Sequence, residues 1–251
     1  MRNPPTMADF PKDTLFNIDY VPEDFVFNER VVEVFDDMVE RSIPFYQEVI
    51  KASAQLLDTF LTTGDTVYDL GCATGTSLLL FSRLLNHKKL HFVGLDTSAP
   101  MLDKARLKSE LYSKQDSISF ALEDIITFDH PGAGGIILHY TLQFIRPLQR
   151  QVFLARLFDN LRPGGVLLIS EKVISHDRRL NRQFIDKYHQ YKKSRGYSEL
   201  EIAKKREALE NVLIPFSVEE NRAMLNKAGF ASVETYFRWF NFASLVAVKP
   251  T

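Results

Sequence analysis

Short runs of apolar residues recur along most of the chain, each stopping at a glycine, an acid or a turn. Such runs are typical of buried strands in a parallel sheet. They predict five strands: Thr66–Leu70, His91–Asp96, Ile118–Leu122, Gly135–His139 and Val166–Ser170. Near the end of the chain, Val233–Trp239 and Phe242–Val248 predict an antiparallel hairpin that completes a seven-stranded sheet.

Other segments carry apolar residues at the spacing of a helix. These segments are Val31–Val39, Tyr46–Thr59, Ser77–Leu85, the segment opened by Ser98, Leu148–Leu161 and Val218–Ala228. Ser217 and Glu220 can form a capping box at the start of the last helix. Strands that alternate with helices imply an α/β fold, in which helices cover both faces of a mostly parallel sheet.

A long polar helical stretch, at about residues 178–212, breaks this alternation after the fifth strand. We expect it to be an insert that serves as a lid or as a dimer arm. The length of 251 residues fits one α/β domain. The sequence therefore predicts a single domain over residues 25–251 and a flexible N-terminal tail over residues 1–24.

The composition of the chain argues against several classes of binding partner. The 31 Lys and Arg residues nearly balance the 32 Asp and Glu residues, so no general surface for nucleic acid or anionic membrane is expected. No apolar run approaches the roughly 20 residues that span a bilayer, and the N-terminus lacks the apolar core of a signal peptide. The single cysteine, Cys72, permits no intrachain disulfide. These features predict a cytoplasmic protein.

The first predicted strand ends in a glycine-rich turn, Asp69-x-Gly71-x-Ala73-x-Gly75. Small residues let the backbone turn sharply and approach a ligand closely, and ligands of such sheets bind at the carboxyl ends of the strands. The turn lacks the Gly-x-Gly-x-x-Gly spacing of dinucleotide-binding proteins, which argues against a nicotinamide enzyme. It resembles the cofactor loop of S-adenosylmethionine-dependent methyltransferases. A tight strand-to-helix turn without a ligand is the alternative.

Acidic residues follow the next two predicted strands. Asp96 ends the second strand and Thr97 follows it; an acid there can accept hydrogen bonds from both ribose hydroxyls. The pair Asp124-Ile125 follows the third strand, where S-adenosylmethionine enzymes commonly hold the adenine. A helix N-terminal acid and a solvated loop aspartate are the respective structural alternatives. With Pro163-Gly164-Gly165 before the fifth strand, this order resembles the Rossmann-like class I methyltransferase fold.

Outside the common fold, the chain closely resembles the family of carboxy-S-adenosyl-L-methionine synthases from about residue 25 to residue 248. The segments that carry the resemblance are Phe27–Phe35, Arg41–Tyr46, Tyr140–Phe144, Ser170–Lys172, Gly196–Ile202, Leu209–Val212 and Phe240–Ala247. The resemblance implies that S-adenosylmethionine is a substrate and that prephenate is the second substrate. The implied products are carboxy-S-adenosyl-L-methionine and phenylpyruvate.

The implied chemistry needs no side-chain base. Prephenate loses carbon dioxide and its ring hydroxyl as it becomes aromatic, and the hydroxide removes a proton from the sulfonium methyl group. The resulting ylide captures the carbon dioxide, so the enzyme mainly holds two substrates together and excludes water. The family also implies a homodimer, and a separate tRNA carboxymethyltransferase that uses the product to modify the wobble uridine. We expect no direct contact with nucleic acid.

The resemblance assigns roles to particular residues. It places Gly71, Cys72 and Ala73 against the cofactor, Tyr46 near the amino-acid part of the cofactor, and Arg206 on the new carboxylate. A guanidinium suits that last role because it can bind a carboxylate through two parallel hydrogen bonds. His139 stands where related sequences carry asparagine, and Ala73 where many carry serine. Both are expected at the site.

The residues alone leave alternatives to these roles. Tyr46 can be a buried aromatic anchor, and His139 a buried strand-end histidine. Six cationic residues can be the solvated faces of helices: Lys192, Lys193, Arg195, Lys204, Lys205 and Arg206. Cys72 has no His close in sequence that could act as its base, so we do not expect a nucleophile. No ligand spacing typical of a metal site is visible, so no metal is expected.

Two other functions compete with the synthase. An ordinary methyltransferase of a small molecule or of tRNA would share the glycine-rich turn, Asp96 and Asp124. A non-catalytic subunit that binds S-adenosylmethionine would use the segment around residues 196–212 only as an oligomer contact. The feature that separates these functions is Arg206 with the surrounding insert.

Overall fold

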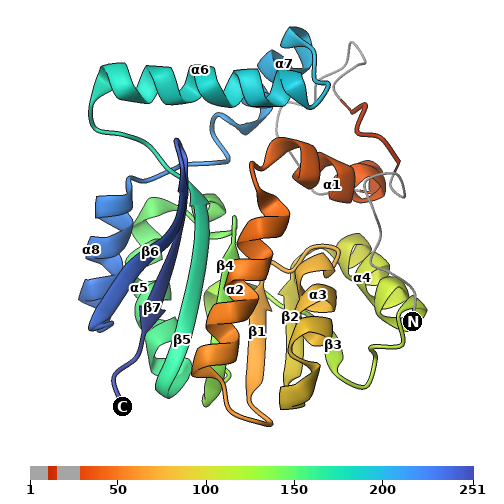
Figure 1. Cartoon of the computed structure of the whole chain (residues 1–251), viewed down its shortest axis with the longest axis vertical. Helices are drawn as coiled ribbons and strands as arrows, with labels where there is room; N and C mark the ends of the chain where they lie inside the picture. The colour runs from red at the N-terminus through yellow and green to blue at the C-terminus, as the bar shows by residue number, and fades with distance from the viewer. Residues whose placement is uncertain (1–10, 16–28) are drawn as a thin grey trace.

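The computed structural model describes residues 11–15 and 29–251. One seven-stranded sheet, with the order β3-β2-β1-β4-β5-β7-β6, forms its centre (Figure 1). The strands are β1 (Thr66–Leu70), β2 (His91–Asp96), β3 (Ile118–Leu122), β4 (Ala133–His139), β5 (Leu161–Lys172), β6 (Ser232–Trp239) and β7 (Phe242–Val248). Strands β1 to β5 are parallel, and β7 pairs antiparallel with both β5 and β6. The predicted mostly parallel sheet and its closing hairpin are confirmed.

Helices cover both faces of this sheet, as the alternating pattern predicts. The helices are α1 (Glu29–Ser42), α2 (Tyr46–Phe60), α3 (Thr76–Leu84), α4 (Ala99–Leu111), α5 (Pro147–Asn160), α6 (Arg178–Ser194), α7 (Glu199–Leu209) and α8 (Val218–Ala228), with 3-10 turns at Asn86–Lys88, Ile125–Thr127 and Leu142–Phe144. Helices α5 and α8 pack into one apolar cluster with β4 and β5, while α2 and α3 pack into a second. None of the described helices is long and apolar enough to cross a bilayer.

The strand order reverses between β1 and β4, which lie side by side at the centre of the sheet. In an open α/β sheet, a crevice forms outside the carboxyl ends of the strands at such a reversal. Residues Ala133–Leu138 of β4 are buried, which explains why this strand reads as a continuous apolar run. The fold therefore places the glycine-rich turn after β1 at the expected ligand position.

The fifth strand begins five residues earlier than its apolar run suggests. We predicted a strand over Val166–Ser170 with a turn at Pro163-Gly164-Gly165, but β5 already pairs with β4 at Leu161. Ala133 faces Leu161 and Gly135 faces Val166, so residues 162–165 bulge out of the ladder. Gly164 has φ 69° there, a backbone conformation that favours glycine.

The predicted helical insert consists of two helices, α6 and α7. Ser198 caps α7 through a capping box with Glu201, and this cap separates the two helices. Both lie beyond the carboxyl ends of the parallel strands, on the same side of the sheet as α1 (Figure 1). The capping box that we predicted at Ser217 and Glu220 is present at the start of α8.

Part of the sequence-based expectations falls outside the described residues. This is true of residues 27 and 28 at the start of the Phe27–Phe35 segment, and of the predicted tail apart from residues 11–15. Within residues 11–15, Asp13 is 1% exposed.

Candidate functional site

A cavity of about 610 Å³ is lined by residues at the carboxyl ends of the central strands and by residues of α1, α6 and α7. Its walls include every site residue that the sequence singled out: Tyr46, Gly71, Cys72, Ala73, Asp96, Thr97, Asp124, Ile125, His139 and Arg206. These residues come from six separate parts of the chain, and the fold brings them to one site.

The glycine-rich turn forms the floor of the cavity beside β1. The backbone N–H groups of Gly71 and Cys72 donate to the carbonyl oxygen of Leu95, which ties the turn to β2. A side chain at Gly71 would lie 2.7 Å from Cγ2 of Thr141, so only glycine fits there. Ala73 has φ 46°, an unfavourable conformation for a residue with a side chain. Such strain is common where backbone is shaped for a ligand.

Asp96 holds this turn in place with its carboxylate. One oxygen accepts a hydrogen bond from Ala73 N–H and the other from Ser98 N–H, both at 2.9 Å. The Ser98 contact fits the helix N-terminal role, while acceptor capacity remains for a ribose. Burial raises the pKa of Asp96, and burial together with Asp96 raises the pKa of Asp69 to about 7.

Asp124 and Ile125, which follow β3, also line the cavity. Oδ1 of Asp124 accepts the N–H of Ile126 at 3.0 Å and so caps the 3-10 turn Ile125–Thr127. The Asp124 side chain is exposed and Ile125 is partly buried. An acid beside an apolar side chain can bind the amino group and one face of a purine.

Tyr46 and His139 line the cavity as well, and both are partly buried. The Tyr46 hydroxyl lies 3.2 Å from Oγ of Ser77, and desolvation raises its pKa. Nε2 of His139 lies 3.1 Å from Oγ of Ser53, whereas Nδ1 is buried with no hydrogen-bond partner among the described residues. Burial lowers the pKa of His139 to about 3, so its imidazole is neutral at physiological pH.

A polar cluster behind the turn was missed from the sequence. Asp36 on α1 accepts hydrogen bonds from Thr74 at 2.6 Å, Thr76 at 2.8 Å and Lys108 at 2.6 Å. Burial raises the pKa of Asp36, but the charge of Lys108 and these hydrogen bonds lower it below its usual value. The cluster fixes α1 over the cavity. Asp36 and Lys108 are 72 residues apart, and local patterns do not reveal such pairs.

Four cationic residues of α6 and α7 differ in their exposure to solvent. Lys193 and Arg206 are exposed, as a solvated helix face would be, but Lys192 and Lys205 are buried. Nζ of Lys205 lies 3.0 Å from Oγ of Ser42 and 3.6 Å from the carboxylate of Asp13. Burial lowers the pKa of Lys205 to about 8. The solvated interpretation is therefore wrong for Lys192 and Lys205.

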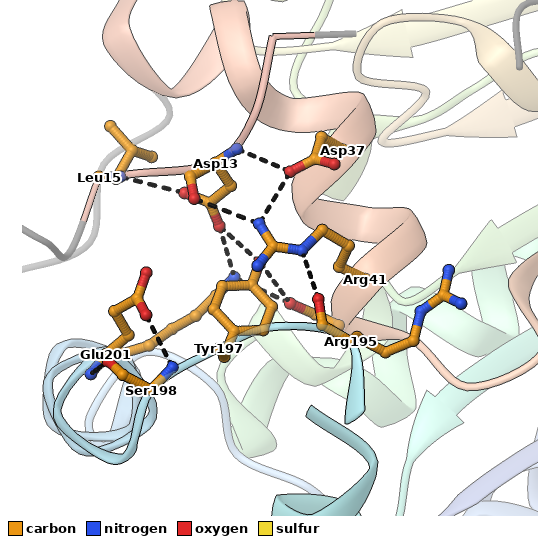
Figure 2. Close-up of polar contacts among 10 residues, drawn as sticks. Asp13, Leu15, Asp37, Arg41, Arg195, Tyr197, Ser198 and Glu201 are labelled. Carbon is orange, nitrogen blue, oxygen red and sulfur yellow. Dashed lines mark hydrogen bonds and ion pairs between the residues drawn. The ribbon is translucent and has the colours of Figure 1, made fainter. Parts of the chain in front are cut away.

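Asp13 joins α1 to the turn between α6 and α7 (Figure 2). Tyr197 donates its hydroxyl proton to Asp13 at 2.6 Å, and the N–H of Asp13 donates to Asp37 at 2.6 Å. Arg41 donates to Asp37, to the Asp13 carbonyl and to the Arg195 carbonyl. This network holds α7, which carries Arg206, against α1 at the rim of the cavity.

Metal ligands do not gather in the described part of the chain: no group of three His, Cys, Asp or Glu side chains there could hold an ion. Cys72 is buried, and burial, Asp69 and Asp96 raise the pKa of its thiol. A thiol in that environment is a poor nucleophile.

Comparison with known proteins places this site in a wider context. A family model described as a methyltransferase domain matches residues 67–165, the part that contains the turn, Asp96 and Asp124. Over 239 residues the chain is 63% identical to the carboxy-S-adenosyl-L-methionine synthase of Desulfotalea psychrophila, which covers 95% of this chain and 98% of that protein. It is 48% identical over 239 residues to the synthase of the same name from Wolinella succinogenes, with the same coverage.

Solved structures with low sequence identity share the fold. An O-methyltransferase family protein from Burkholderia thailandensis has a TM-score of 0.65 at 19% identity, covering 90% of this chain and 61% of that chain. The YcgJ protein from Bacillus subtilis has a TM-score of 0.61 at 11% identity, covering 82% of this chain and 100% of that chain. These similarities confirm the class I methyltransferase fold that the sequence predicts.

Proposed function

The chain belongs to the family of carboxy-S-adenosyl-L-methionine synthases, and from this premise we propose that its cavity converts S-adenosylmethionine and prephenate into carboxy-S-adenosyl-L-methionine and phenylpyruvate. One observation carries the proposal. The cavity that contains the glycine-rich turn also contains Arg206 from the insert. The product carries an additional carboxylate on its methyl carbon, and a guanidinium can bind that group through two parallel hydrogen bonds.

Different residues of the cavity bind different parts of S-adenosylmethionine. The backbone of Gly71, Cys72 and Ala73 approaches the cofactor, which is here a substrate. Asp96, with Thr97 beside it, accepts hydrogen bonds from the ribose hydroxyls. Its carboxylate also accepts a hydrogen bond from Ala73 N–H, which holds the turn beside the ribose.

The adenine and the amino-acid part bind at the two ends of the turn. Asp124 and Ile125 bind the adenine, while Tyr46 and the neutral His139 contact the amino-acid part. Arg206 binds the new carboxylate. His139 is neutral, so it does not repel the positively charged sulfonium, whereas a charged imidazolium would.

The reaction balances without a protein base. Prephenate releases carbon dioxide and hydroxide and becomes phenylpyruvate. The hydroxide takes one proton from the sulfonium methyl group and leaves as water. The methyl carbon then forms a bond to carbon dioxide. The chain contributes position and exclusion of bulk water, and α1, α6 and α7 form the roof that can do this.

The wider setting belongs to the same proposal. The protein acts in the cytoplasm as a homodimer, without a metal and without binding nucleic acid. A separate tRNA carboxymethyltransferase takes up its product to build the wobble-uridine modification.

Mass spectrometry of the reaction products tests the proposal. The purified chain is incubated with S-adenosylmethionine, with and without prephenate. We expect a nucleoside heavier than S-adenosylmethionine by one carbon dioxide, together with phenylpyruvate, only when prephenate is present. Formation of S-adenosylhomocysteine with a small molecule or tRNA as methyl acceptor, and no carboxylated nucleoside, would contradict the proposal.

A further inference from the structure

Two lysines of the cavity have no carboxylate partner among the described residues. Lys172 ends β5 and Lys192 lies on α6, and both line the cavity. Lys192 is only 6% exposed. Nζ of Lys172 lies 5.4 Å from the centre of the Tyr188 ring, and Nζ of Lys192 lies 4.7 Å from it. The two ammonium groups therefore lie against one aromatic side chain.

This arrangement is unfavourable without a ligand. Burial lowers the pKa of both lysines, and Lys205 and Lys172 lower that of Lys192 further. The carboxylate of Asp13 acts in the opposite direction on Lys192, but it already accepts the proton of Tyr197 and pairs with Lys205. Buried charges of one sign are usually found where a ligand of the other sign binds.

Aromatic side chains form the wall beside these lysines. The Tyr188 ring lies 5.0 Å from Phe242, and the Tyr140 ring lies 6.3 Å from Phe242. The Tyr140 hydroxyl is buried with no hydrogen-bond partner among the described residues, and Tyr140 has φ 62°. An unpartnered buried hydroxyl on strained backbone is a second indication of a ligand at this wall.

The wall adjoins the residues assigned to S-adenosylmethionine. The Tyr140 ring lies 6.2 Å from that of Tyr46 and 6.5 Å from that of His139. A molecule on the Tyr140 and Tyr188 rings would lie beside the cofactor. Transfer of carbon dioxide between two substrates requires such proximity.

We infer that Lys172, Lys192, Tyr140 and Tyr188 form the binding site of the second substrate, a six-membered ring that carries two carboxylates. Each lysine pairs with one carboxylate, the aromatic wall packs against the ring, and the Tyr140 hydroxyl bonds to its polar edge. The assignment rests on the proposed function, since prephenate has this chemistry. Arg206 is left for the carboxylate of the product.

Kinetics of lysine variants test the assignment. Lys172→Met and Lys192→Met remove the ammonium groups and keep most of the side-chain volume. We expect each to raise KM for prephenate by roughly 10- to 100-fold, the usual loss for a charge-assisted hydrogen bond. The Kd of S-adenosylmethionine, measured by calorimetry, should change by less than about threefold. Lys187→Met, an exposed lysine on the same helix, is the matched control and should leave both constants unchanged.

The outcomes separate the two proposals. If the wild-type chain makes no carboxylated product from prephenate, the proposed function fails. If the wild-type chain is active and both lysine variants keep its KM for prephenate, the second-substrate site is wrong. Equal loss of affinity for S-adenosylmethionine in the lysine variants would also overturn it. If either methionine variant has a lower melting temperature than the control, Lys172→Gln and Lys192→Gln replace it. Calorimetric titration with prephenate then measures the Kd, and an unchanged Kd in both glutamine variants would again overturn the site.

Discussion

Burial sets the protonation state of side chains in the cavity wall and directly behind it. It lowers the pKa of His139 to about 3, and it raises the pKa of Glu171 to about 8 although Leu142 and Gln143 donate backbone hydrogen bonds to that carboxylate. The family resemblance predicted that His139 lies at the site, since related sequences carry asparagine at this strand end. Its neutrality depends on the packing around it, which the sequence does not reveal.

His139→Asn tests that neutrality. A histidine with a folded pKa near 3 and an unfolded pKa of about 6.5 binds more protons in the unfolded state between these values. The histidine therefore lowers the free energy of unfolding as the pH falls from about 6.5 towards 3. The asparagine variant should show a weaker decline in urea midpoints over that range, and S-adenosylmethionine affinity within about threefold of wild type. Identical pH profiles would contradict the low pKa.

In the proposed function, Arg206 is the residue that distinguishes product from substrate. Arg206→Ala removes a guanidinium that pairs with the new carboxylate, so the Kd of carboxy-S-adenosyl-L-methionine should rise by roughly 10- to 100-fold. The Kd of S-adenosylmethionine, which lacks that carboxylate, should change little. Calorimetry with both ligands gives the comparison, and an equal loss for both would remove the role of Arg206.

At the scale of elements, the roof of the cavity depends on contacts between distant segments. Periodicity predicted α1, α2, α8 and most strands with bounds close to those observed. Each of these helices buries one apolar face, and most of the strands are buried along most of their length. Periodicity did not predict that Lys192 and Lys205 are buried, because α6 and α7 are polar and their partners lie far away in sequence. The early start of β5 was missed because Pro163 and the glycines after it resemble a turn.

Asp13→Asn tests how this roof is held. The change removes the carboxylate that lies 3.6 Å from Nζ of the buried Lys205, which should lower the free energy of unfolding by about 1–3 kcal/mol. Amide hydrogen exchange should become faster in Glu199–Leu209 than in β1 and β4. Asp116→Asn, at an exposed position, is the control. Unchanged exchange in α7 would show that Asp13 does not anchor it.

At the scale of the whole molecule, apolar side chains remain exposed on the roof helices. Leu180 on α6 is 51% exposed and Leu200 on α7 is 59% exposed. These side chains fit the expectation that the insert is a dimer arm. In the account proposed above, the ordinary methyltransferase elements bind S-adenosylmethionine, and the roof helices bind the second substrate and form the dimer contact.

Leu200→Glu tests the dimer arm. A charge in an apolar subunit contact should shift the protein from dimer to monomer in sedimentation at micromolar concentration, because an unpaired buried charge is costly. Leu148→Glu on α5, where the leucine is 95% exposed, is the control and should remain dimeric. A dimer that survives Leu200→Glu but not Leu148→Glu would place the interface on the opposite part of the molecule.

The fate of one carbon atom tests the central claim, that S-adenosylmethionine accepts the carbon dioxide lost by prephenate in this cavity. Prephenate labelled with ¹³C at its ring carboxyl group is supplied in buffer with unlabelled bicarbonate, and the products are weighed by mass spectrometry. We predict that carboxy-S-adenosyl-L-methionine carries the label and that phenylpyruvate does not. Unlabelled carboxy-S-adenosyl-L-methionine, or label found only in dissolved bicarbonate, would contradict the account.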